Sequence, residues 1–358
     1  MQTVIVKASD GHCDVDGIKQ AANILRSGGL VAFPTETVYG LGADGLNGQA
    51  VRKIFAAKGR PADNPLILHI FDLKQLEEIA AAVPDCAQRL IDKFWPGPLT
   101  LILPRGDRVP DAVTAGLDTV GVRMPDNDIA LAFLAACKVP VAAPSANVSG
   151  RPSPTSALDV MDDLGGRVDC IIDGGKCSVG IESTVLDVTR PTPVVLRPGA
   201  ATVEDIRSVV GEVAIDPCAD GIDDCATSTP ARSPGVKYRH YAPIAPLVLF
   251  EGDPKARLVE LSRRIEKLVA EGKTVGVAVV SESLPYLPSG NGERLVVRDM
   301  GSALDPSRIA ATLFSVLRAM DRDKVDIILV EGIHDTGVGF AVMNRLRRAA
   351  GGAVVRCS

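Results

Sequence analysis

The sequence predicts an α/β protein with two domains. The chain has 358 residues, and domains average about 150 residues, so about two are expected. Short apolar runs alternate with helical patterns along the chain, as in α/β folds. A stretch at 211–232, rich in Asp, Pro, Gly and Ser, interrupts this alternation with five acidic residues and one basic residue, a composition typical of a loop. We therefore expect a first domain at 1–210, a linker at 211–243 and a second domain at 244–358.

In the first domain, helices and strands are predicted in a mixed order. Ile18, Ala22 and Leu25 share one face at helical spacing, and the same periodicity predicts a second helix over 49–57. Short apolar runs predict strands, and these are residues 30–33, 66–70, 99–103, 120–123, 139–143, 170–172 and 184–188. Such a mixture is typical of an open α/β domain and excludes an all-helical or all-β one.

In the second domain, two dipeptides mark where helices begin. Asp253-Pro254 and Asp305-Pro306 each offer an N-cap followed by Pro at the first helical position, and apolar residues at helical spacing follow both. Strands are predicted at 247–250, 275–280 and 325–330. The last is almost wholly apolar, as expected of a strand covered on both faces. The alternation predicts a Rossmann-like layer structure, and because no G-x-G-x-x-G opens it, dinucleotide binding is unsupported.

Charge and composition exclude several classes of protein. The net charge is −5, which argues against nucleic acid as the main partner, because phosphate backbones require a basic excess. The apolar runs stop after about nine residues, short of the roughly twenty that span a membrane. The N-terminus lacks the pattern of a secretory signal, so we expect a cytoplasmic protein. Eight scattered cysteines favour reduced, structural thiols, although Cys218 and Cys225 flank the acidic loop and could pair.

Four polar segments lie at predicted strand ends of the first domain. They are residues 34–42 (PTETVYGLG), 58–65 (KGRPADNP) with the downstream His69, 119–125 (TVGVRMP) and 142–153 (AAPSANVSGRPS). Loops at strand ends hold ligands in open α/β sheets. Plainer explanations stay open, namely a local turn, a solvated charge pair, a core histidine and a surface arginine. Two later pieces, at 180–184 and 196–199, are similar in kind.

Phosphate binding is the chemistry that these segments favour. Lys58 and Arg60 are two residues apart in a loop stiffened by Gly and Pro, so both cations could reach one polyanion. The sequence has no P-loop, no G-x-S-x-G elbow and no H-x-x-x-H zinc pattern. Phosphates would therefore be held by dispersed Arg, Lys, Ser and Thr side chains, with Mg²⁺ carried on the phosphates and no metal ligand from the protein. The residues alone support a nucleotide or other polyanion site.

The four segments together resemble the YrdC-like threonylcarbamoyl-adenylate synthases. Residues 233–243 (SPGVKYRHYAP) are similar to the linker of the long, two-domain form of this family. The resemblance implies a nucleotidyltransferase that makes L-threonylcarbamoyl-AMP from L-threonine, bicarbonate and ATP and releases pyrophosphate. The product would feed downstream transferase machinery that modifies adenosine 37 of tRNA. The resemblance also implies a first domain with a concave cleft, a Rossmann-like second domain and a linker that closes as a lid.

The resemblance assigns roles to individual residues. L-threonine would be held by Thr37, His69, Arg123, Ala143 and Ser183. ATP would be held by Lys58, Arg60, Asn64, Thr119, Ser145, Asn147, Ser153, Arg197, Lys237, Tyr238, His240 and Tyr241. Lys58 and Arg60 would also be the catalytic residues. No covalent nucleophile is needed, and no general base can be named.

Two other classes of protein are rivals to this interpretation. The first is a module that binds tRNA or double-stranded RNA without catalysis, which a net charge of −5 without basic–aromatic interleaving disfavours. The second is a maturation enzyme that uses carbamoyl phosphate and contains a related domain. That enzyme would require zinc-finger cysteines and an acylphosphatase-like N-terminus, and the sequence has neither.

Overall fold

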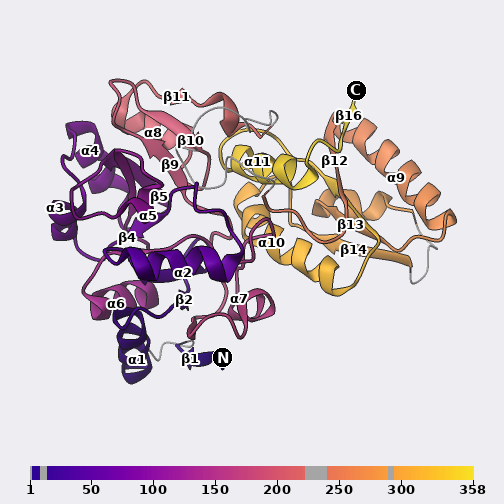
Figure 1. Cartoon of the computed structure of the whole chain (residues 1–358). Helices are drawn as coiled ribbons and strands as arrows, with labels where there is room; N and C mark the ends of the chain where they lie inside the picture. Colours follow the sequence, from indigo (N-terminus) through magenta and orange to yellow (C-terminus); the bar gives the residue numbers. More distant parts are fainter. Residues whose placement is uncertain (1, 9–13, 222–239, 289–293) are drawn as a thin grey trace. The chain divides into compact units, whose positions relative to one another are not determined.

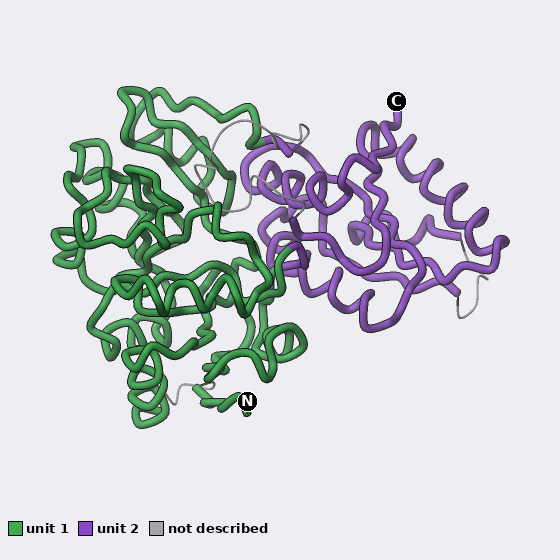
Figure 2. The backbone as a smooth tube through the Cα atoms, viewed as in Figure 1, with its two compact units in different colours: residues 1–149, 153–219, 225–238 green, residues 150–152, 220–224, 239–358 purple. Residues whose placement is uncertain are grey.

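A computed structural model describes residues 2–8, 14–221, 240–288 and 294–358 (Figure 1). The chain divides into two compact units (Figure 2). Unit 1 comprises residues 1–149, 153–219 and 225–238, and unit 2 comprises residues 150–152, 220–224 and 239–358. Most of the expected linker, residues 222–239, lies outside the described residues.

Unit 1 contains an eleven-stranded mixed sheet in the order β1-β8-β2-β3-β7-β4-β6-β5-β9-β10-β11. The strands are β1 (Val4–Lys7), β2 (Val31–Phe33), β3 (Gly40–Asp44), β4 (Ile67–His69), β5 (Leu99–Pro104), β6 (Thr119–Arg123), β7 (Val141–Ala142), β8 (Cys170–Asp173), β9 (Thr184–Asp187), β10 (Val194–Arg197) and β11 (Ala214–Ile215). The sheet contains parallel pairs, such as β4 and β6, and antiparallel pairs, such as β5 and β6. Strands that are far apart in the sequence, such as β1 and β8, lie side by side in the sheet.

The helices of unit 1 are α1 (Val15–Arg26), α2 (Gly48–Lys58), α3 (Leu76–Ile79), α4 (Asp85–Phe94), α5 (Asp111–Thr114), α6 (Asp128–Cys137), α7 (Ala157–Leu164) and α8 (Val203–Val210), with short 3-10 turns at Leu73–Gln75 and Pro217–Ala219. The predicted apolar face of α1 is buried in a core that also contains Phe33 and Phe133. Helix α2 confirms the helix expected over 49–57, and it ends at Gly59, whose φ of 61° suits a glycine C-cap.

Unit 2 is Rossmann-like, as predicted, with a five-stranded sheet in the order β14-β13-β15-β12-β16 in which every pair is parallel. Its elements are β12 (Leu247–Gly252), α9 (Pro254–Ala270), β13 (Val275–Val279), a 3-10 helix (Ser281–Tyr286), β14 (Leu295–Asp299), α10 (Pro306–Arg322), β15 (Ile327–Glu331), α11 (Val338–Ala350) and β16 (Val354–Cys357). The two predicted N-caps are confirmed. Asp253 accepts from the backbone N–H groups of the first turn of α9, and Asp305 does so for α10.

Two expectations about local structure were wrong. Lys58 ends helix α2 instead of lying in a loop. In the segment 34–42, residues from Gly40 onward form strand β3, although its glycines suggested a ligand loop. A Cβ at Gly40 would lie 3.2 Å from the ring of Phe33, and one at Gly42 would lie 2.9 Å from Val141. These glycines therefore allow close packing within the sheet.

Among the described cysteines, one departs from the expectation of reduced thiols. Cys218 is disulfide-bonded, whereas Cys86, Cys137, Cys170, Cys177 and Cys357 are free. Cys225, the partner that the sequence suggested, lies outside the described residues. Among the helices that the structure describes, none is long and apolar enough to cross a membrane.

Candidate functional site

Two predicted threonine-binding residues meet where β4 and β6 end. These strands are parallel, and His69 pairs in register with Arg123. The backbone N–H of Ile70 donates to the carbonyl oxygen of Arg123 at 3.0 Å, which extends the pairing beyond His69. Both side chains are buried. The sheet order, which no local pattern reveals, therefore brings together residues that are 54 positions apart (123 minus 69).

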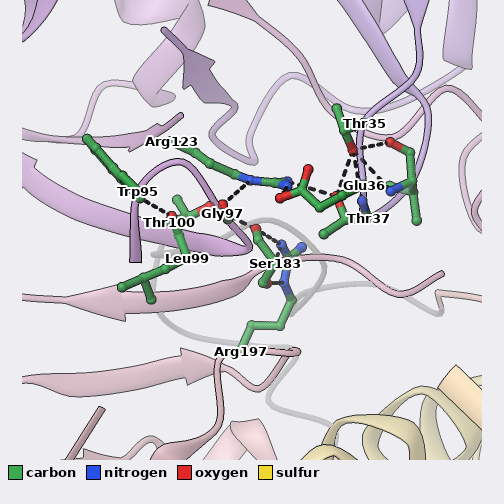
Figure 3. Close-up of polar contacts among 11 residues, drawn as sticks. Thr35, Glu36, Thr37, Trp95, Gly97, Leu99, Thr100, Arg123, Ser183 and Arg197 are labelled. Carbon is green, nitrogen blue, oxygen red and sulfur yellow. Dashed lines mark hydrogen bonds and ion pairs between the residues drawn. The ribbon is translucent and has the colours of Figure 1, made fainter. Parts of the chain in front are cut away.

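The guanidinium group of Arg123 contacts two segments of unit 1 (Figure 3). Its Nε donates to the carbonyl oxygen of Gly97 at 3.1 Å, and its Nη1 donates to Thr37 Oγ1 at 2.8 Å. Its Nη2 lies 2.5 Å from Glu36 Oε1, in an ion pair whose side chains are only 4% and 7% exposed. The predicted neighbours Thr37 and Arg123 are thus in direct contact. The sequence pattern assigned no role to Glu36.

The loop before β3 is held by its own hydroxyl groups and by a distant segment. Thr35 Oγ1 lies 2.8 Å from Thr37 Oγ1, and it donates to the carbonyl oxygen of Val38 at 2.6 Å. Such local bonds are those of a Ser/Thr turn, which was the plainer interpretation of this segment. The backbone N–H of Gly180 also donates to the carbonyl oxygen of Thr37 at 3.1 Å. The loop is therefore fixed next to the segment that leads to Ser183.

Ser183 is positioned by contacts from β5 and β10. Its hydroxyl lies 2.8 Å from Thr100 Oγ1 and accepts from Arg197 Nη2 at 3.2 Å. Its carbonyl oxygen accepts from Arg197 Nε at 3.1 Å and from Nη2 at 2.9 Å. Figure 3 shows this group next to the group around Arg123. Sequence reasoning missed Thr100, although a threonine within an apolar strand is a signal that could have found it.

His69 is neutral in this environment. Burial, and then the positive charge of Arg123, lower its pKa to about 3 from an ordinary value of about 6.5. Its ring meets that of Phe33 edge to face, with centroids 5.9 Å apart and planes at 86°. His69 can therefore take part in hydrogen bonding without adding a charge near neutral pH.

A second group joins three of the predicted ATP-binding residues. The Lys58 side chain is buried, and its Nζ donates to the carbonyl oxygens of Ser145 and Asn147, both at 2.5 Å. Ser145 Oγ donates to Asn147 Oδ1 at 2.6 Å, and the backbone N–H of Ser149 donates to the carbonyl oxygen of Lys58 at 2.9 Å. The ammonium group therefore ties the end of α2 to the segment 142–153.

Arg60 has partners other than those of Lys58. Its Nη2 donates to the carbonyl oxygens of Asn64 at 3.2 Å and Pro65 at 3.3 Å, and its guanidinium lies 6.0 Å from the centre of the Phe55 ring. The spacing of Lys58 and Arg60 suggested two cations sharing one loop. In the structure, Gly59 separates a helical lysine from a loop arginine.

The remaining predicted residues are placed as follows. Ala143 is buried, and its N–H donates to the carbonyl oxygen of Ile67 at 2.9 Å. Thr119 begins β6 whereas Arg123 ends it, so about 13 Å of strand separates them. Ser153 donates its hydroxyl to Glu182 Oε1. These positions leave the roles assigned by resemblance as predictions.

The predicted linker residues are described only in part. Lys237 and Tyr238 lie outside the described residues. His240 and Tyr241 belong to unit 2. There the Tyr241 ring stacks on Phe314 with centroids 5.4 Å apart, and the Arg345 guanidinium lies 5.5 Å from the centre of the Tyr241 ring.

Two family models match the chain in sequence. The model described as "Telomere recombination" matches residues 23–199. The model described as "Threonylcarbamoyl-AMP synthase, C-terminal domain" matches residues 201–351. The first match contains the groups around Arg123 and Lys58, and the second contains the whole five-stranded sheet except β16.

Relatives and solved structures match over nearly the whole chain. The threonylcarbamoyl-AMP synthase of Pyrococcus abyssi is 49% identical over 343 residues, 95% of each chain. That of Bacillus subtilis is 48% identical, over 95% of this chain and 94% of the other. The crystal structure of P. abyssi Sua5 complexed with L-threonine has a TM-score of 0.92 at 46% identity, and the match covers 99% of this chain and 100% of that one. The chain therefore belongs to the threonylcarbamoyl-AMP synthase family, in its two-domain form.

Proposed function

We propose that this enzyme makes L-threonylcarbamoyl-AMP from L-threonine, bicarbonate and ATP and releases pyrophosphate, as a nucleotidyltransferase. The observation that carries the proposal is the buried polar cluster formed by Thr37, Arg123 and Ser183 with their neighbours (Figure 3). It lies in a chain similar over 99% of its length to a protein crystallised with L-threonine.

The amino acid would bind at Arg123. A guanidinium group pairs with a carboxylate through two parallel hydrogen bonds, and Arg123 is held in place by Gly97 and Thr37. His69, which pairs with Arg123 in register, would offer a neutral hydrogen-bonding group. Ser183 would contribute a hydroxyl that Thr100 and Arg197 hold in place.

ATP would bind as its Mg²⁺ complex at Ser145, Asn147 and Ser153, with Arg60 and Arg197 near the phosphates. Because Lys58 donates to two carbonyl oxygens of the segment 142–153, its first effect is to shape the nucleotide loop. Its positive charge would add to that of the arginines and stabilise the negative charge that develops during phosphoryl transfer.

The reaction then needs two steps. The threonine amine and bicarbonate form a carbamate and water, and a carbamate oxygen attacks the α-phosphorus of ATP, so that the bond to pyrophosphate breaks. The carbamate is labile in water, and burial of the cluster around Arg123 supports a role in excluding solvent. Positioning and cationic stabilisation supply the acceleration, and no covalent enzyme intermediate is required.

We place this reaction in the cytoplasm, upstream of the transferase machinery that modifies adenosine 37 of tRNA. A net charge of −5 disfavours tight direct binding of tRNA, because non-specific affinity depends on basic side chains. The link to tRNA would therefore run through the product. The rival function, an RNA-binding module without catalysis, predicts tight binding of tRNA and no product.

Mass spectrometry tests the proposal. The protein is incubated with ATP, L-threonine, bicarbonate and Mg²⁺, and threonylcarbamoyl-AMP is sought together with pyrophosphate. We expect product that depends on all three substrates and falls strongly in Arg60→Ala. Tight tRNA binding without any product would reject the proposal in favour of the RNA-binding module. Turnover of Arg60→Ala near that of the wild type would reject the phosphate-binding role of Arg60 alone.

A further inference from the structure

The carboxylate of Glu36 is buried with only part of its bonding capacity used. The Glu36 side chain is 7% exposed, and Oε1 lies 2.5 Å from Arg123 Nη2. This contact is an ion pair, and neither Oε1 nor Oε2 has a hydrogen-bond partner among the residues that the structure describes. An ionised carboxylate can accept about four hydrogen bonds, and a buried one that lacks them is costly. A donor that reaches this carboxylate would therefore supply a hydrogen bond that the described residues do not.

The open carboxylate lies inside the cluster that the proposed function uses. Figure 3 shows the Glu36 carboxylate at the tip of the Arg123 side chain, on the side of Thr37. Thr37 receives a hydrogen bond from the same guanidinium at 2.8 Å. A molecule bound to Arg123 through its own carboxylate would therefore have Glu36 beside it.

The charges of the cluster match those of an amino acid. Arg123 is positive, Glu36 is negative, and His69 is neutral because burial and Arg123 lower its pKa to about 3. Arg123 alone would attract any carboxylate, including hydroxy acids and keto acids. A free α-amino acid is a zwitterion, with an ammonium group two bonds from the carboxylate carbon. A site that holds one positive and one negative group at contact distance is complementary to both ends.

We infer that Glu36 binds the α-ammonium group of the substrate, so that Glu36 and Arg123 together select an α-amino acid over acids that lack the ammonium group. The inference rests on the proposed function, because it concerns the substrate of the same site. Glu36 would donate no atom to the product, and the ammonium group must lose one proton before its nitrogen forms the carbamate bond. Its effect is on which acid binds and how the nitrogen is oriented.

Selection by this pair follows from the cost of an unmatched group. The ammonium group of threonine would fill the open position at Oε2 with a charge-assisted hydrogen bond. A hydroxyl group in the same place could donate one hydrogen bond but would bring no positive charge to a buried carboxylate. Sites that form such bonds reject analogues lacking the group, because the buried partner is then left unmatched.

Binding measurements test the inference. Dissociation constants are measured by calorimetry for L-threonine and for 2,3-dihydroxybutanoate, in which a hydroxyl group replaces the ammonium group. The wild type is expected to prefer L-threonine by more than about tenfold, the size of a good charge-assisted hydrogen bond. Glu36→Gln is expected to reduce this preference to below about threefold, mainly by weakening the binding of L-threonine. Glu36→Asp, which keeps the charge, should restore part of the preference.

A matched control separates recognition from general damage. Glu331 of unit 2 is also buried and pairs with an arginine, since its Oε1 lies 3.2 Å from Arg257 Nη2. Glu331→Gln therefore removes the same charge from a comparable pair, and it should leave the preference for L-threonine as in the wild type. Circular dichroism at the temperature of the titration confirms that each variant is folded.

The outcomes distinguish this inference from the proposed function. If the wild type makes threonylcarbamoyl-AMP but Glu36→Gln keeps the full preference for L-threonine, the inference about Glu36 is wrong and the function stands. Equal affinity of the wild type for L-threonine and 2,3-dihydroxybutanoate would also show that the inference about Glu36 is wrong. This measurement does not depend on the folding of any variant. If the wild type neither binds L-threonine nor forms product, the proposed function fails as well.

Discussion

Each unit contains a buried arginine–glutamate pair, and the two pairs differ in how fully the carboxylate is used. In unit 2, Glu331 Oε1 accepts from Arg257 and from Ser283 Oγ at 3.0 Å, and Oε2 accepts from the backbone N–H of Val280 at 3.2 Å. In unit 1, Glu36 Oε1 lies 2.5 Å from Arg123 Nη2, but neither Oε1 nor Oε2 has a hydrogen-bond partner in the described part of the chain.

This difference separates a structural pair from a binding pair. Both arginines and both glutamates are at least nine-tenths buried, so burial alone does not tell them apart. A carboxylate whose oxygens are all satisfied fixes its surroundings and has nothing left to offer a ligand. One with an open oxygen gains its missing bond when a donor arrives. The completeness of hydrogen bonding is therefore the observation that identifies the functional pair.

Removing Arg123 should give the largest effect. Arg123→Ala takes away the proposed carboxylate partner and leaves Glu36 buried without a countercharge. We expect kcat/KM for L-threonine to fall about a thousandfold, or ~4 kcal/mol, measured by pyrophosphate release. Arg108→Ala, at an exposed arginine paired with Glu78, serves as the control. A fall of less than about tenfold for Arg123→Ala would show that the pair in unit 1 is structural too.

Neutralising Glu331 should affect stability instead of activity. Glu331→Gln leaves the Arg257 guanidinium buried without its countercharge, which lowers the free energy of unfolding by about 3 kcal/mol. Denaturant unfolding measures this loss. The KM for L-threonine should stay within about twofold of the wild type, since the pair lies in unit 2. A clear rise in KM would mean that the pair in unit 2 also affects the binding of L-threonine, and the distinction between a structural pair and a binding pair would be wrong.

The neutral state of His69 predicts a pH dependence of stability. Its pKa in the folded protein is about 3, below the value of about 6.5 in the unfolded chain, so the unfolded state binds the proton first. The contribution of His69 is therefore constant above pH 6.5 and is lost as the pH falls toward 3. By pH 5 the loss should reach about 2 kcal/mol.

Unfolding by denaturant at about pH 7.5, 6 and 5 checks this dependence. His69→Gln should flatten the curve relative to the wild type, because glutamine does not titrate. Equal slopes for the two proteins would mean that His69 takes up its proton at the same pH in the folded and the unfolded state. The cluster around Arg123 would then carry an extra positive charge below about pH 6.5.

The hydroxyl of Thr100 should give the smallest effect. Thr100→Val keeps the shape of the side chain and removes the hydrogen bond to Ser183 Oγ, which still accepts from Arg197. We expect a cost of about 1 kcal/mol, or about a fivefold rise in KM for L-threonine. Thr114→Val offers a control at another buried threonine of unit 1. An unchanged KM would place Ser183 outside the substrate contacts.

Much of the fold was predictable because its signals are local. The caps at Asp253 and Asp305 and the apolar face of α1 depend on residues within a few turns, and all are confirmed. The strand expected at 139–143 forms only as Val141–Ala142. These two residues pair with β3 and β4, and the longer apolar run around them overestimated the length of the strand.

The candidate site was harder to predict because its contacts cross the sheet. Glu36 and Arg123 are 87 residues apart (123 minus 36), and no spacing rule connects them. Their contact follows from the order of the strands, which is set by packing over the whole unit. Lys58 shows the opposite difficulty. Its neighbours Gly59 and Pro61 suggested a loop, but the helix continues until Gly59 allows the left-handed turn that ends it.

The hydrogen bonds of Lys58 also affect whether the proposed product can acylate this lysine. The proposed product is a mixed anhydride, which acylates amines, and a free lysine beside it would become a target. Lys58 Nζ donates to two backbone carbonyl oxygens and the residue is 2% exposed, so burial and these bonds keep it away from an acyl group in the cleft. We expect peptide mapping after many turnovers to find Lys58 unmodified while exposed lysines such as Lys19 acquire threonylcarbamoyl groups. A buried lysine can thus lie near a reactive acyl adenylate without being acylated by it.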